Sequence, residues 1–328
     1  MLTTSVLIPS YKRPERLAVC LRSLEDQVVP PNEVIVVWQS DDRTTLDAAE
    51  FFRKTAPFPV HIVYCPVAGI VPAENVALSH ASGDVLLLLD DDAAVHPSWL
   101  ECHLRHYADP NVGAVGAPTR NFDLDGRPFP VREPKHIGRL TWYGRMIGNL
   151  FDLPEKWSAR LPAEVDHLPA NNMSVRRSAF EIFEEALKPY WQTFECDACL
   201  QVKSRGYRIL LDFSNTVSHY PTNPIFRQTR DGDLALMVFH PAYNHALVLA
   251  KHCRGMQRGV CLLYLLAIGS VASPGVVGFV AAFLRYGNIR RELRIFRETI
   301  RWRLTGWSAG SRLRVSAPAR MMLLQHAK

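Results

Sequence analysis

The segment that decides the fold is Gly83-Asp84-Val85-Leu86-Leu87-Leu88-Leu89-Asp90-Asp91-Asp92. Its five consecutive apolar residues predict a buried strand, as in parallel sheets that are covered on both faces. Three carboxylates follow directly, and they repel one another unless a cation compensates their charge. Ligands bind parallel sheets at the carboxyl ends of the strands, and carboxylate oxygens suit Mg²⁺ or Mn²⁺. The segment therefore predicts a metal site, and the simpler alternative is a polar turn that caps the next helix.

Strand-like and helix-like segments alternate on both sides of this motif. Short apolar runs predict strands at 6–8, 34–38, 60–64, 84–89, 112–116 and 208–213. Helical spacing predicts helices at 13–27, 44–54, 72–82, 97–107 and 195–205, and 168–183 is expected to lead into another. This alternation predicts an α/β fold with a mostly parallel sheet that is flanked by helices.

The composition predicts a folded chain of two parts. Of its 328 residues, 48% are hydrophobic and 21% are charged, which fits a packed core rather than disorder. We expect one α/β domain over 1–225, with a first half at about 1–118 and a second half at about 119–225. From 226 to 328 we expect a helical region, because an uncharged stretch there is followed by a basic one.

Five segments in series resemble family 2 glycosyltransferases. The stretch 83–92 is similar to the acidic metal motif of that family, and 5–13 is similar to its opening. The other matches are 69–83, 169–177, and the acidic run 194–197 followed by 206–208. Because all five occur in the family's order over roughly 4–245, together they are more specific than any one of them.

The resemblance implies a GT-A fold and an inverting glycosyltransferase. Such an enzyme moves a hexosyl or deoxyhexosyl group from a nucleoside-diphosphate sugar to a hydroxyl of a glycan or lipid-linked acceptor, as in polysaccharide biosynthesis. The first half of the domain would bind the donor and the second half the acceptor. The general base that inversion requires would be Glu195, with Asp197 as the alternative, although both acids could simply cap a helix. Mg²⁺ or Mn²⁺ would stabilise the departing diphosphate.

The resemblance also implies the residues that bind the donor and the metal. The metal ligands would be Asp90, Asp92 and His219, which follows a strand where related enzymes often have a histidine. The alternative for His219 is a packed histidine without a ligand role. The residues expected to contact the nucleotide sugar are Pro9, Ser10, Tyr11, Arg13, Gln39, Asn75, Asp90, Asp91, Asn172 and Arg176.

Three positions depart from the family pattern. Trp38 and Gln39 stand where acids that contact the base or ribose are common, and Glu74 stands where the family often has an arginine. Two other functions therefore stay open. One is a nucleotidyltransferase that makes the nucleotide sugar, but such enzymes have a glycine-rich loop after the first strand and 9–14 contains no glycine. The other is a non-catalytic binding protein on the same fold, which the intact acids disfavour.

The positive charge of the chain lies in its C-terminal segment. Eleven basic and two acidic residues give the segment from Arg285 onward a net charge of +9, whereas the whole chain carries +6. We expect the partner of this segment to be an anionic membrane surface and not a nucleic acid. We expect no signal peptide, because Pro9 ends the first apolar run early, and the scattered cysteines fit a reducing compartment.

An uncharged stretch of 25 residues, 260–284, precedes the basic segment. It is long enough to cross a bilayer, which takes about 20 residues. However, glycines and a proline interrupt it at 269–275, and basic residues flank it on both sides, which opposes a single span. We expect a re-entrant or interfacial hairpin, or else a buried core helix, with 289–304 lying on anionic headgroups. The enzyme would then be cytoplasmic and attached peripherally or monotopically to the inner face of the cell membrane.

Overall fold

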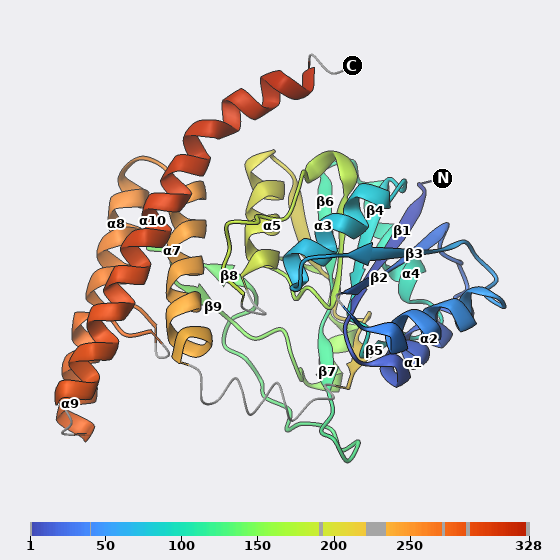
Figure 1. The fold of residues 1–328 in the computed structure, drawn as a ribbon, viewed down its shortest axis with the longest axis horizontal. Helices are drawn as coiled ribbons and strands as arrows, with labels where there is room; N and C mark the ends of the chain where they lie inside the picture. The colour runs from blue at the N-terminus through green and yellow to red at the C-terminus, as the bar shows by residue number, and fades with distance from the viewer. Residues whose placement is uncertain are drawn as a thin grey trace. The chain divides into compact units, whose positions relative to one another are not determined.

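The computed structural model describes residues 2–39, 41–189, 193–220, 234–270, 273–286 and 289–325. The chain divides into two compact units, and Figure 1 shows the helices and strands of each. Unit 1 comprises 1–139, 147–183 and 195–223, and unit 2 comprises 140–146, 184–194 and 224–328.

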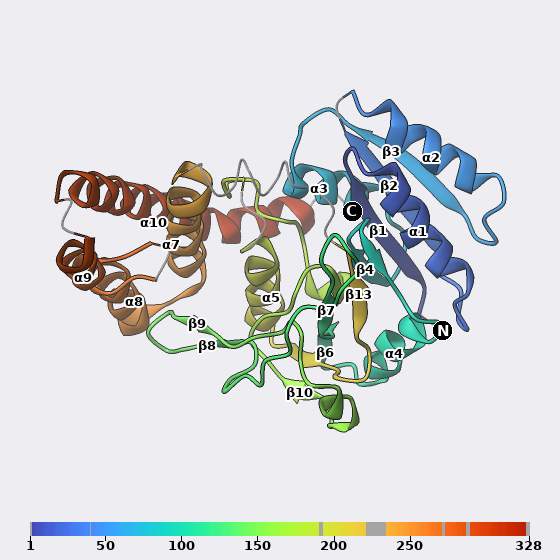
Figure 2. The ribbon, with the colours of Figure 1, turned by 90° about the horizontal axis from the view of Figure 1, so that it is seen from below.

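An eight-stranded sheet forms the centre of unit 1 (Figures 1 and 2). Its strands are β1 (Thr4–Ser10), β2 (Glu33–Gln39), β3 (Val60–Cys65), β4 (Val85–Leu89), β6 (Val112–Gly116), β10 (Ala163–Glu164), β11 (Asn172–Arg176) and β12 (Arg208–Leu211). They lie in the order β10-β12-β6-β11-β4-β1-β2-β3. Strands β1, β2, β3 and β4 are parallel to one another, as are β6 and β12, whereas β11 and β10 run antiparallel to their neighbours. The predicted mostly parallel sheet is confirmed.

Helices cover both faces of this sheet. The helical segments of unit 1 are α1 (Pro14–Glu25), α2 (Arg43–Arg53), α3 (Ile70–His80), α4 (Trp99–Leu104), α5 (Phe194–Ser204) and the short turns η1 (Arg105–Ala108), η2 (Glu155–Ala159) and η3 (Arg177–Ala179). One core cluster joins α1, α2 and α4 to alternate strand residues such as Val6 and Ile8. Leu7, between them, is also fully buried and points to the opposite face, because strand side chains alternate. Both faces of β1 are therefore covered.

Local sequence explains where the first two helices begin. Pro14, which has no N–H to satisfy, occupies the first turn of α1. The Asp42 carboxylate caps α2 by accepting the backbone N–H of Thr45 at 3.2 Å. The starts of α1 and α2 determine where the loops after β1 and β2 end. Both loops lie at the edge where ligands of an α/β sheet bind.

The segment 168–183 does not lead into a helix, contrary to the prediction. It contains the strand β11, in which Met173 and Val175 alternate with Asn172 and Ser174, and all four are fully buried. A period of two is the strand pattern, but polar residues at two of the buried positions concealed it in the sequence. An antiparallel strand therefore sits between β4 and β6.

A small three-stranded sheet completes unit 1. Its strands are β5 (Ala93–Ala94), β7 (Thr119–Asn121) and β13 (Val217–His219), with β13 in the middle. Strand β13 is parallel to β7 and antiparallel to β5, so that His219 lies opposite Ala93. This pairing brings the end of β13 next to the acidic motif that follows β4.

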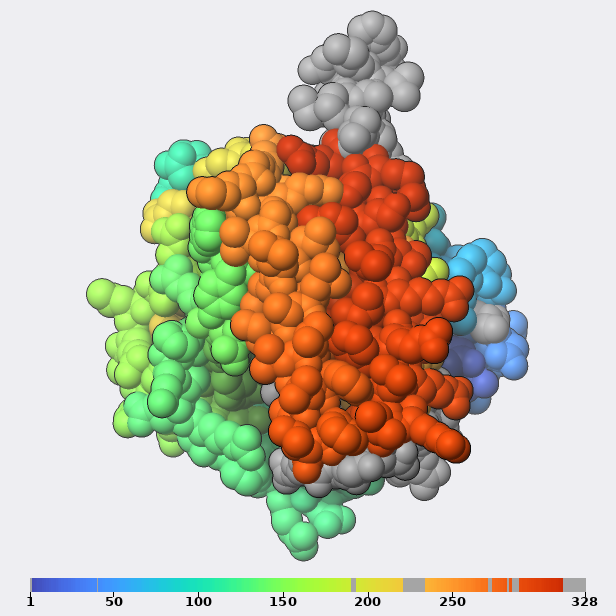
Figure 3. Space-filling model, turned by 90° about the vertical axis from the view of Figure 1, so that its left-hand side faces the viewer, coloured from blue at the N-terminus to red at the C-terminus, as the bar shows by residue number. Residues whose placement is uncertain are grey.

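Unit 2 is mostly helical. Its elements are the π-helical turn η4 (Ala235–Phe239), α7 (His240–His252), α8 (Gly255–Ala267), α9 (Val276–Tyr286) and α10 (Ile289–Gln325). The tip of the hairpin formed by β8 (Arg139–Leu140) and β9 (Met146–Ile147) also belongs to this unit. Figure 3 shows α8, α9 and α10 on one face of unit 2.

The uncharged stretch forms parts of two helices, α8 and α9, with the glycine- and proline-containing segment between them. The basic helix α10 contains 37 residues and is much longer than the predicted 289–304. Within the described ranges, none of the helices combines the length and the apolar composition that a membrane crossing requires.

Candidate active site

The acidic motif and β13 meet at the carboxyl edge of the large sheet. Strand β4 ends at Leu89, so Asp90 leaves the sheet at the edge where ligands bind α/β folds. The Nε2 atom of His219 lies 3.0 Å from Oδ1 of Asp92 and 3.8 Å from Oδ2 of Asp90. One ligand atom from each of these three residues lies within 4.8 Å of the other two. Two carboxylates and an imidazole are thus close enough together to hold one metal ion.

Asp91 has different partners from its two neighbours. Its carboxylate accepts a hydrogen bond from the Ser10 hydroxyl at 2.6 Å and pairs with Arg13 at 2.6 Å. The Arg13 guanidinium also contacts Asp92. Burial, together with the charge of Asp92, raises the pKa of Asp91 to about 7, although Arg13 opposes this shift. A single arginine therefore serves two of the three adjacent carboxylates.

Positive charge in this cluster is scarce, and the pKa values reflect it. Burial and the charge of Asp92 raise the pKa of Asp90 to about 6. Burial would also raise the pKa of Asp92, but the hydrogen bond from His219 and the charge of Arg13 lower it. Burial would lower the pKa of His219, but its hydrogen bond to Asp92 raises it. The carboxylates thus favour a positive charge at the His219 imidazole, and carboxylate oxygens with one imidazole are a ligand set that fits Mn²⁺ or Mg²⁺.

Three further residues complete the site and were not predicted from the sequence. The Oδ1 atom of Asn121 lies 2.8 Å from Nδ1 of His219, and the Asn121 side chain donates to Asp152 at 3.0 Å. Tyr220 donates its backbone N–H to the carbonyl oxygen of Asp92 at 2.8 Å. No local motif marks these residues, because each contacts a residue that is distant in the chain. The separations are 98 residues for Asn121 and His219, 31 for Asn121 and Asp152, and about 130 for Tyr220 and Asp92.

The predicted donor residues of β1 and β2 lie at this same edge of the sheet. Pro9 and Ser10 end β1, and Tyr11 follows them. Gln39 ends β2, and its buried side chain accepts the backbone N–H of Gly69 at 2.8 Å. The contacts of these residues with a nucleotide sugar stay predictions.

The two predicted asparagines are engaged in the hydrogen bonding of the fold itself. The Asn75 carboxamide makes two hydrogen bonds of 3.0 Å with the backbone of Phe183. Asn172 is fully buried, and its Oδ1 atom accepts the indole N–H of Trp99 at 2.9 Å. This geometry favours an architectural role for both side chains, and their role in donor binding stays a prediction.

Arg176 lies away from the acidic cluster. It pairs with Val85 at the first residue of β4, whereas Asp90 follows the last. Its guanidinium donates hydrogen bonds to the backbone carbonyls of Val112 and Tyr107, both at 3.0 Å. The structure therefore does not bring Arg176 together with the other predicted donor residues, and we leave it out of the proposed site.

Helix α5 carries both candidate bases in its first turn. Asp197 is fully buried and accepts a hydrogen bond from the Gln201 side chain at 2.9 Å. Glu195 is only partly buried. A general base must reach the hydroxyl that it deprotonates, so this difference in exposure favours Glu195 over Asp197.

Glu74, at the position where an arginine is common, is buried on α3. Burial, with a contribution from the charge of Asp90, raises its pKa well above the ordinary value. The uncharged acid is therefore favoured, and the substitution of arginine by glutamate removes a positive charge near the cluster without adding a full negative one.

The mostly parallel sheet flanked by helices, with an acidic cluster at its carboxyl edge, is the arrangement of the GT-A fold class. Residues 5–181 match the family described as Glycosyl transferase family 2, and the chain belongs to that family.

Relatives in sequence include biosynthetic proteins of bacteria. The chain is 36% identical to the succinoglycan biosynthesis protein ExoM of Rhizobium meliloti (strain 1021) over 114 residues, which cover 34% of this chain and 37% of that protein. It is 24% identical to the uncharacterized glycosyltransferase YfnE of Bacillus subtilis (strain 168) over 260 residues, which cover 67% of this chain and 65% of that protein. The chain thus spans about a third of the first relative and just under two thirds of the second.

Solved structures share the fold at low identity. The crystal structure of GalNAc-T7 with UDP, GalNAc and Mn²⁺ matches with a TM-score of 0.61 and 14% identity, over 90% of this chain and 56% of that one. The mannosyltransferase PcManGT of Pyrobaculum calidifontis, in complex with GDP-Man and Mn²⁺, matches with a TM-score of 0.57 and 15% identity. This match covers 96% of this chain and 87% of that one.

Proposed function

We propose that this glycosyltransferase moves a sugar from a nucleoside-diphosphate sugar to a hydroxyl of a glycan or lipid-linked acceptor, with inversion and with a divalent metal. The observation that carries the proposal is the convergence of Asp90, Asp92 and His219 at the carboxyl edge of the sheet. The relatives named for polysaccharide biosynthesis and the nucleotide-bound structural neighbours support it.

Asp90, Asp92 and His219 would hold the metal. The imidazole is a less hard ligand than a carboxylate, so we propose Mn²⁺ ahead of Mg²⁺. When bound, the cation would act as a Lewis acid that stabilises the charge of the departing diphosphate. Asp91 would keep Arg13 and Ser10 in place beside the cation ligands through its two 2.6 Å contacts.

Glu195 would act as the general base. It would take the proton of the acceptor hydroxyl while that oxygen attacks the anomeric carbon from the face opposite the diphosphate. Inversion follows because a single displacement occurs. Asp197 would support the first turn of α5 through its hydrogen bond with Gln201.

The metal proposal is tested with Asp92→Ala. We expect this change, and to a lesser degree Asp90→Ala, to abolish the Mn²⁺-dependent binding of nucleoside diphosphates, measured by titration calorimetry with UDP, GDP and dTDP. Asp125→Ala is the matched control, because the Asp125 side chain is 69% exposed. Circular dichroism would establish that each variant is folded. Mn²⁺-dependent binding that survives in Asp92→Ala would contradict the proposal.

The activity itself is tested by release of nucleoside diphosphate. The wild type is incubated with UDP, GDP and dTDP sugars, with Mn²⁺ and then with Mg²⁺. We expect slow metal-dependent hydrolysis of the correct donor, since water can replace the acceptor. Binding of a nucleoside diphosphate without turnover of any sugar donor, even with candidate acceptors, would favour the non-catalytic alternative.

We also propose that unit 2 attaches the enzyme to the anionic inner face of the cell membrane. Among the side chains of α8 and α9 that the structure describes, the large exposed ones are apolar, namely Met256, Leu263, Val276, Val277, Val280 and Leu284. A helix face that presents apolar side chains to solvent is a binding surface.

Helix α10 supplies the matching charge. Exposed arginines recur along it at helical spacing, at Arg290, Arg294, Arg297 and Arg301. The rings of Phe279 on α9 and Phe296 on α10 stack at 4.9 Å, which joins the apolar helix to the basic one. Apolar side chains beside arginines are the pattern of helices that lie in a membrane interface.

A further inference from the structure

The orientation of the Asn121 side chain is fixed by its neighbour. Asp152 accepts the Asn121 backbone N–H at 2.8 Å with one carboxylate oxygen and the Asn121 side chain at 3.0 Å with the other. A carboxylate only accepts hydrogen bonds, so the NH₂ group of Asn121 must face Asp152. The amide oxygen of Asn121 therefore faces His219, and a flipped amide would put two acceptors in contact.

The same logic fixes the protonated nitrogen of His219. The Asn121 oxygen can only accept, and it lies 2.8 Å from Nδ1 of His219, so Nδ1 carries a hydrogen. In the neutral imidazole the other nitrogen, Nε2, then carries the lone pair. That nitrogen faces Asp92 at 3.0 Å and Asp90 at 3.8 Å.

We propose that Asn121 and Asp152 are positioning residues that hold His219 as an Nε2 ligand for a divalent cation. The inference rests on the metal site of the proposed function and adds the residues that orient one of its ligands. Outer hydrogen-bond partners of this kind fix the tautomer and the ring orientation of a metal-binding histidine.

The backbone around these residues holds the three side chains in line. Asn121 and His219 are register partners in the parallel pair of β7 and β13. Asp152 donates its backbone N–H to Thr119, two residues before Asn121, at 2.8 Å. Its carboxylate is mostly buried and has Arg120 at 3.7 Å as a counter-charge. These contacts hold Asp152, Asn121 and His219 in line.

Three variants test the proposal. Asp152→Asn keeps the shape of the side chain but no longer forces the Asn121 amide into one orientation. Asn121→Ala removes the acceptor. The double variant Asn121→Asp/Asp152→Asn exchanges the two groups, so that a carboxylate again accepts from Nδ1 and an amide again donates to it. Asp125→Asn, at an exposed position of the same loop region, is the control.

The first readout is the proton on Nδ1 of His219 in metal-free protein, from ¹⁵N NMR and its exchange with solvent. We expect a hydrogen-bonded, slowly exchanging Nδ1–H in the wild type, the control and the double variant, and faster exchange in Asp152→Asn and Asn121→Ala. A wild type without a proton on Nδ1, or single variants with an unchanged Nδ1–H signal, would overturn the proposal.

The second readout is the Kd for Mn²⁺ alone, from the electron paramagnetic resonance signal of the free ion. We expect each single variant to bind about 10-fold more weakly and the double variant to recover to within about 3-fold of the wild type. Equal affinity in all variants would overturn the positioning role. A wild type that binds no Mn²⁺ would overturn the metal site itself, and the Nδ1–H signal of the metal-free protein separates that failure from a failure of the hydrogen-bonded chain.

Discussion

Three adjacent aspartates take three different environments because all three lie in the turn between β4 and β5, where successive side chains point in different directions. Asp90 lies near His219, Asp91 turns to Ser10 and Arg13, and Asp92 bonds with His219. Repulsion among neighbouring carboxylates is thereby partly relieved by separate partners. The remaining negative charge is concentrated where Asp90 and Asp92 both approach the Nε2 atom of His219. This is why a cation is the ligand that the cluster favours.

The two acids of α5 are predicted to respond differently to neutralisation. Glu195→Gln should bind donor normally but lower turnover by about 10²-fold or more, the scale of lost general-base catalysis. Asp197→Asn should lower stability more than turnover, because Asp197 is buried against Gln201. Single-turnover rates and melting curves separate the two effects. A large loss of turnover in Asp197→Asn with none in Glu195→Gln would assign the base to Asp197.

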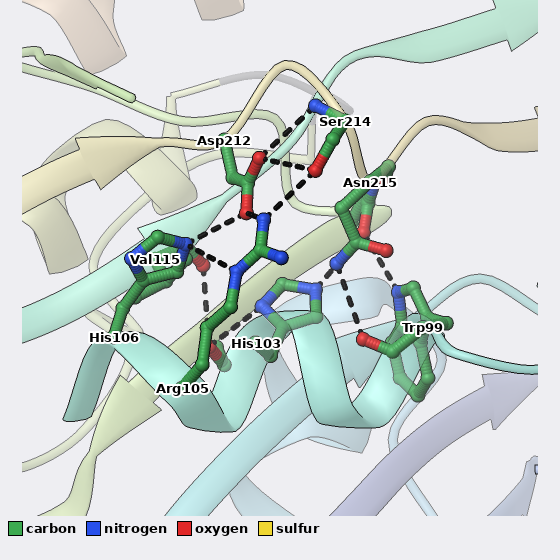
Figure 4. Close-up of polar contacts among 10 residues, drawn as sticks. Trp99, His103, Arg105, His106, Val115, Asp212, Ser214 and Asn215 are labelled. Atoms are coloured by element: carbon green, nitrogen blue, oxygen red, sulfur yellow. Dashed lines mark hydrogen bonds and ion pairs between the residues drawn. The ribbon is translucent and has the colours of Figure 1, made fainter. Parts of the chain in front are cut away.

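A buried polar network joins α4 and η1 to the segment that follows β12 (Figure 4). His103 is fully buried, with Ser174 at 2.9 Å from Nδ1 and Asn172 at 3.2 Å from Nε2. Beside it, the Asp212 carboxylate accepts hydrogen bonds from His106 at 2.7 Å and Ser214 at 2.7 Å. The network satisfies the imidazole of His103 in its neutral form, and burial lowers the pKa of His103 to about 4.

Acid should destabilise unit 1 through His103. In the unfolded chain a histidine takes up a proton below about pH 6.5, whereas folded His103 does so only near pH 4. Its folded pKa is depressed, so stability is fully present above pH 6.5 and is lost as the pH falls toward 4, by at most about 3 kcal/mol. Urea unfolding between these pH values should show this loss, and His103→Gln should reduce it. Exposed His80→Gln is the control, and equal pH dependence in both variants would refute the prediction.

At the scale of elements, sequence patterns predicted the helices and strands whose signals come from neighbouring residues in the chain. The run of apolar residues in β4 and the spacing of Leu17, Leu21 and Leu24 on α1 depend only on neighbours in the chain, and both elements are present. Strand β11 was missed because its buried polar residues are satisfied by partners on α4, which a sequence does not reveal.

The site shows the same limit. The acidic motif was predicted from its position after a strand, and His219 was predicted because related enzymes often have a histidine after the corresponding strand. Asn121 and Asp152 were not found, because their roles depend on the parallel pairing of β7 with β13, which joins residues about a hundred positions apart. Gly306 and Gly310 also went unnoticed, although they determine how the longest helix packs.

The packing of α10 on α7 depends on those two glycines. A Cβ atom at Gly306 would lie 2.2 Å from the carbonyl oxygen of Tyr243, and one at Gly310 would lie 2.1 Å from that of Leu247. Helix backbones approach this closely only where small residues recur four apart. Since backbone atoms cannot move aside as flexible side chains can, the helices must separate if either glycine gains a side chain.

Gly306→Ala should therefore lower the free energy of unfolding by about 1–3 kcal/mol, the usual cost of overpacking, despite the better helix propensity of alanine. Gly259→Ala on α8 is the matched control, because a Cβ there meets nothing within 4 Å. It should stabilise by up to about 1 kcal/mol. Denaturant unfolding followed by circular dichroism measures both, and an equal gain in the two variants would exclude the close contact.

At the scale of the whole molecule, charge is divided along the chain. The segment from Arg285 onward carries +9 and the preceding residues are net acidic, since the total is +6. Removing 255–328 would be a poor test of membrane binding, because α10 packs along α7 and its loss would uncover apolar residues such as Leu247 and Leu249. Substitutions on exposed faces keep this packing and test the surface directly.

Reversing the charge of α10 should release the protein from membranes. We would replace the exposed Arg290, Arg294 and Arg297 by Glu, which removes about 1 kcal/mol of attraction to anionic lipid at each position. Binding to phosphatidylserine vesicles at low salt should therefore fall by about 100-fold or more. Binding of nucleoside diphosphate with Mn²⁺ should persist. The matched control reverses three exposed charges of α2 and its cap, Arg43, Arg53 and Lys54, and should bind vesicles like the wild type. If the wild type does not bind these vesicles, or if the charge-reversed α10 variant binds them like the wild type, an anionic membrane surface is ruled out as the partner of unit 2.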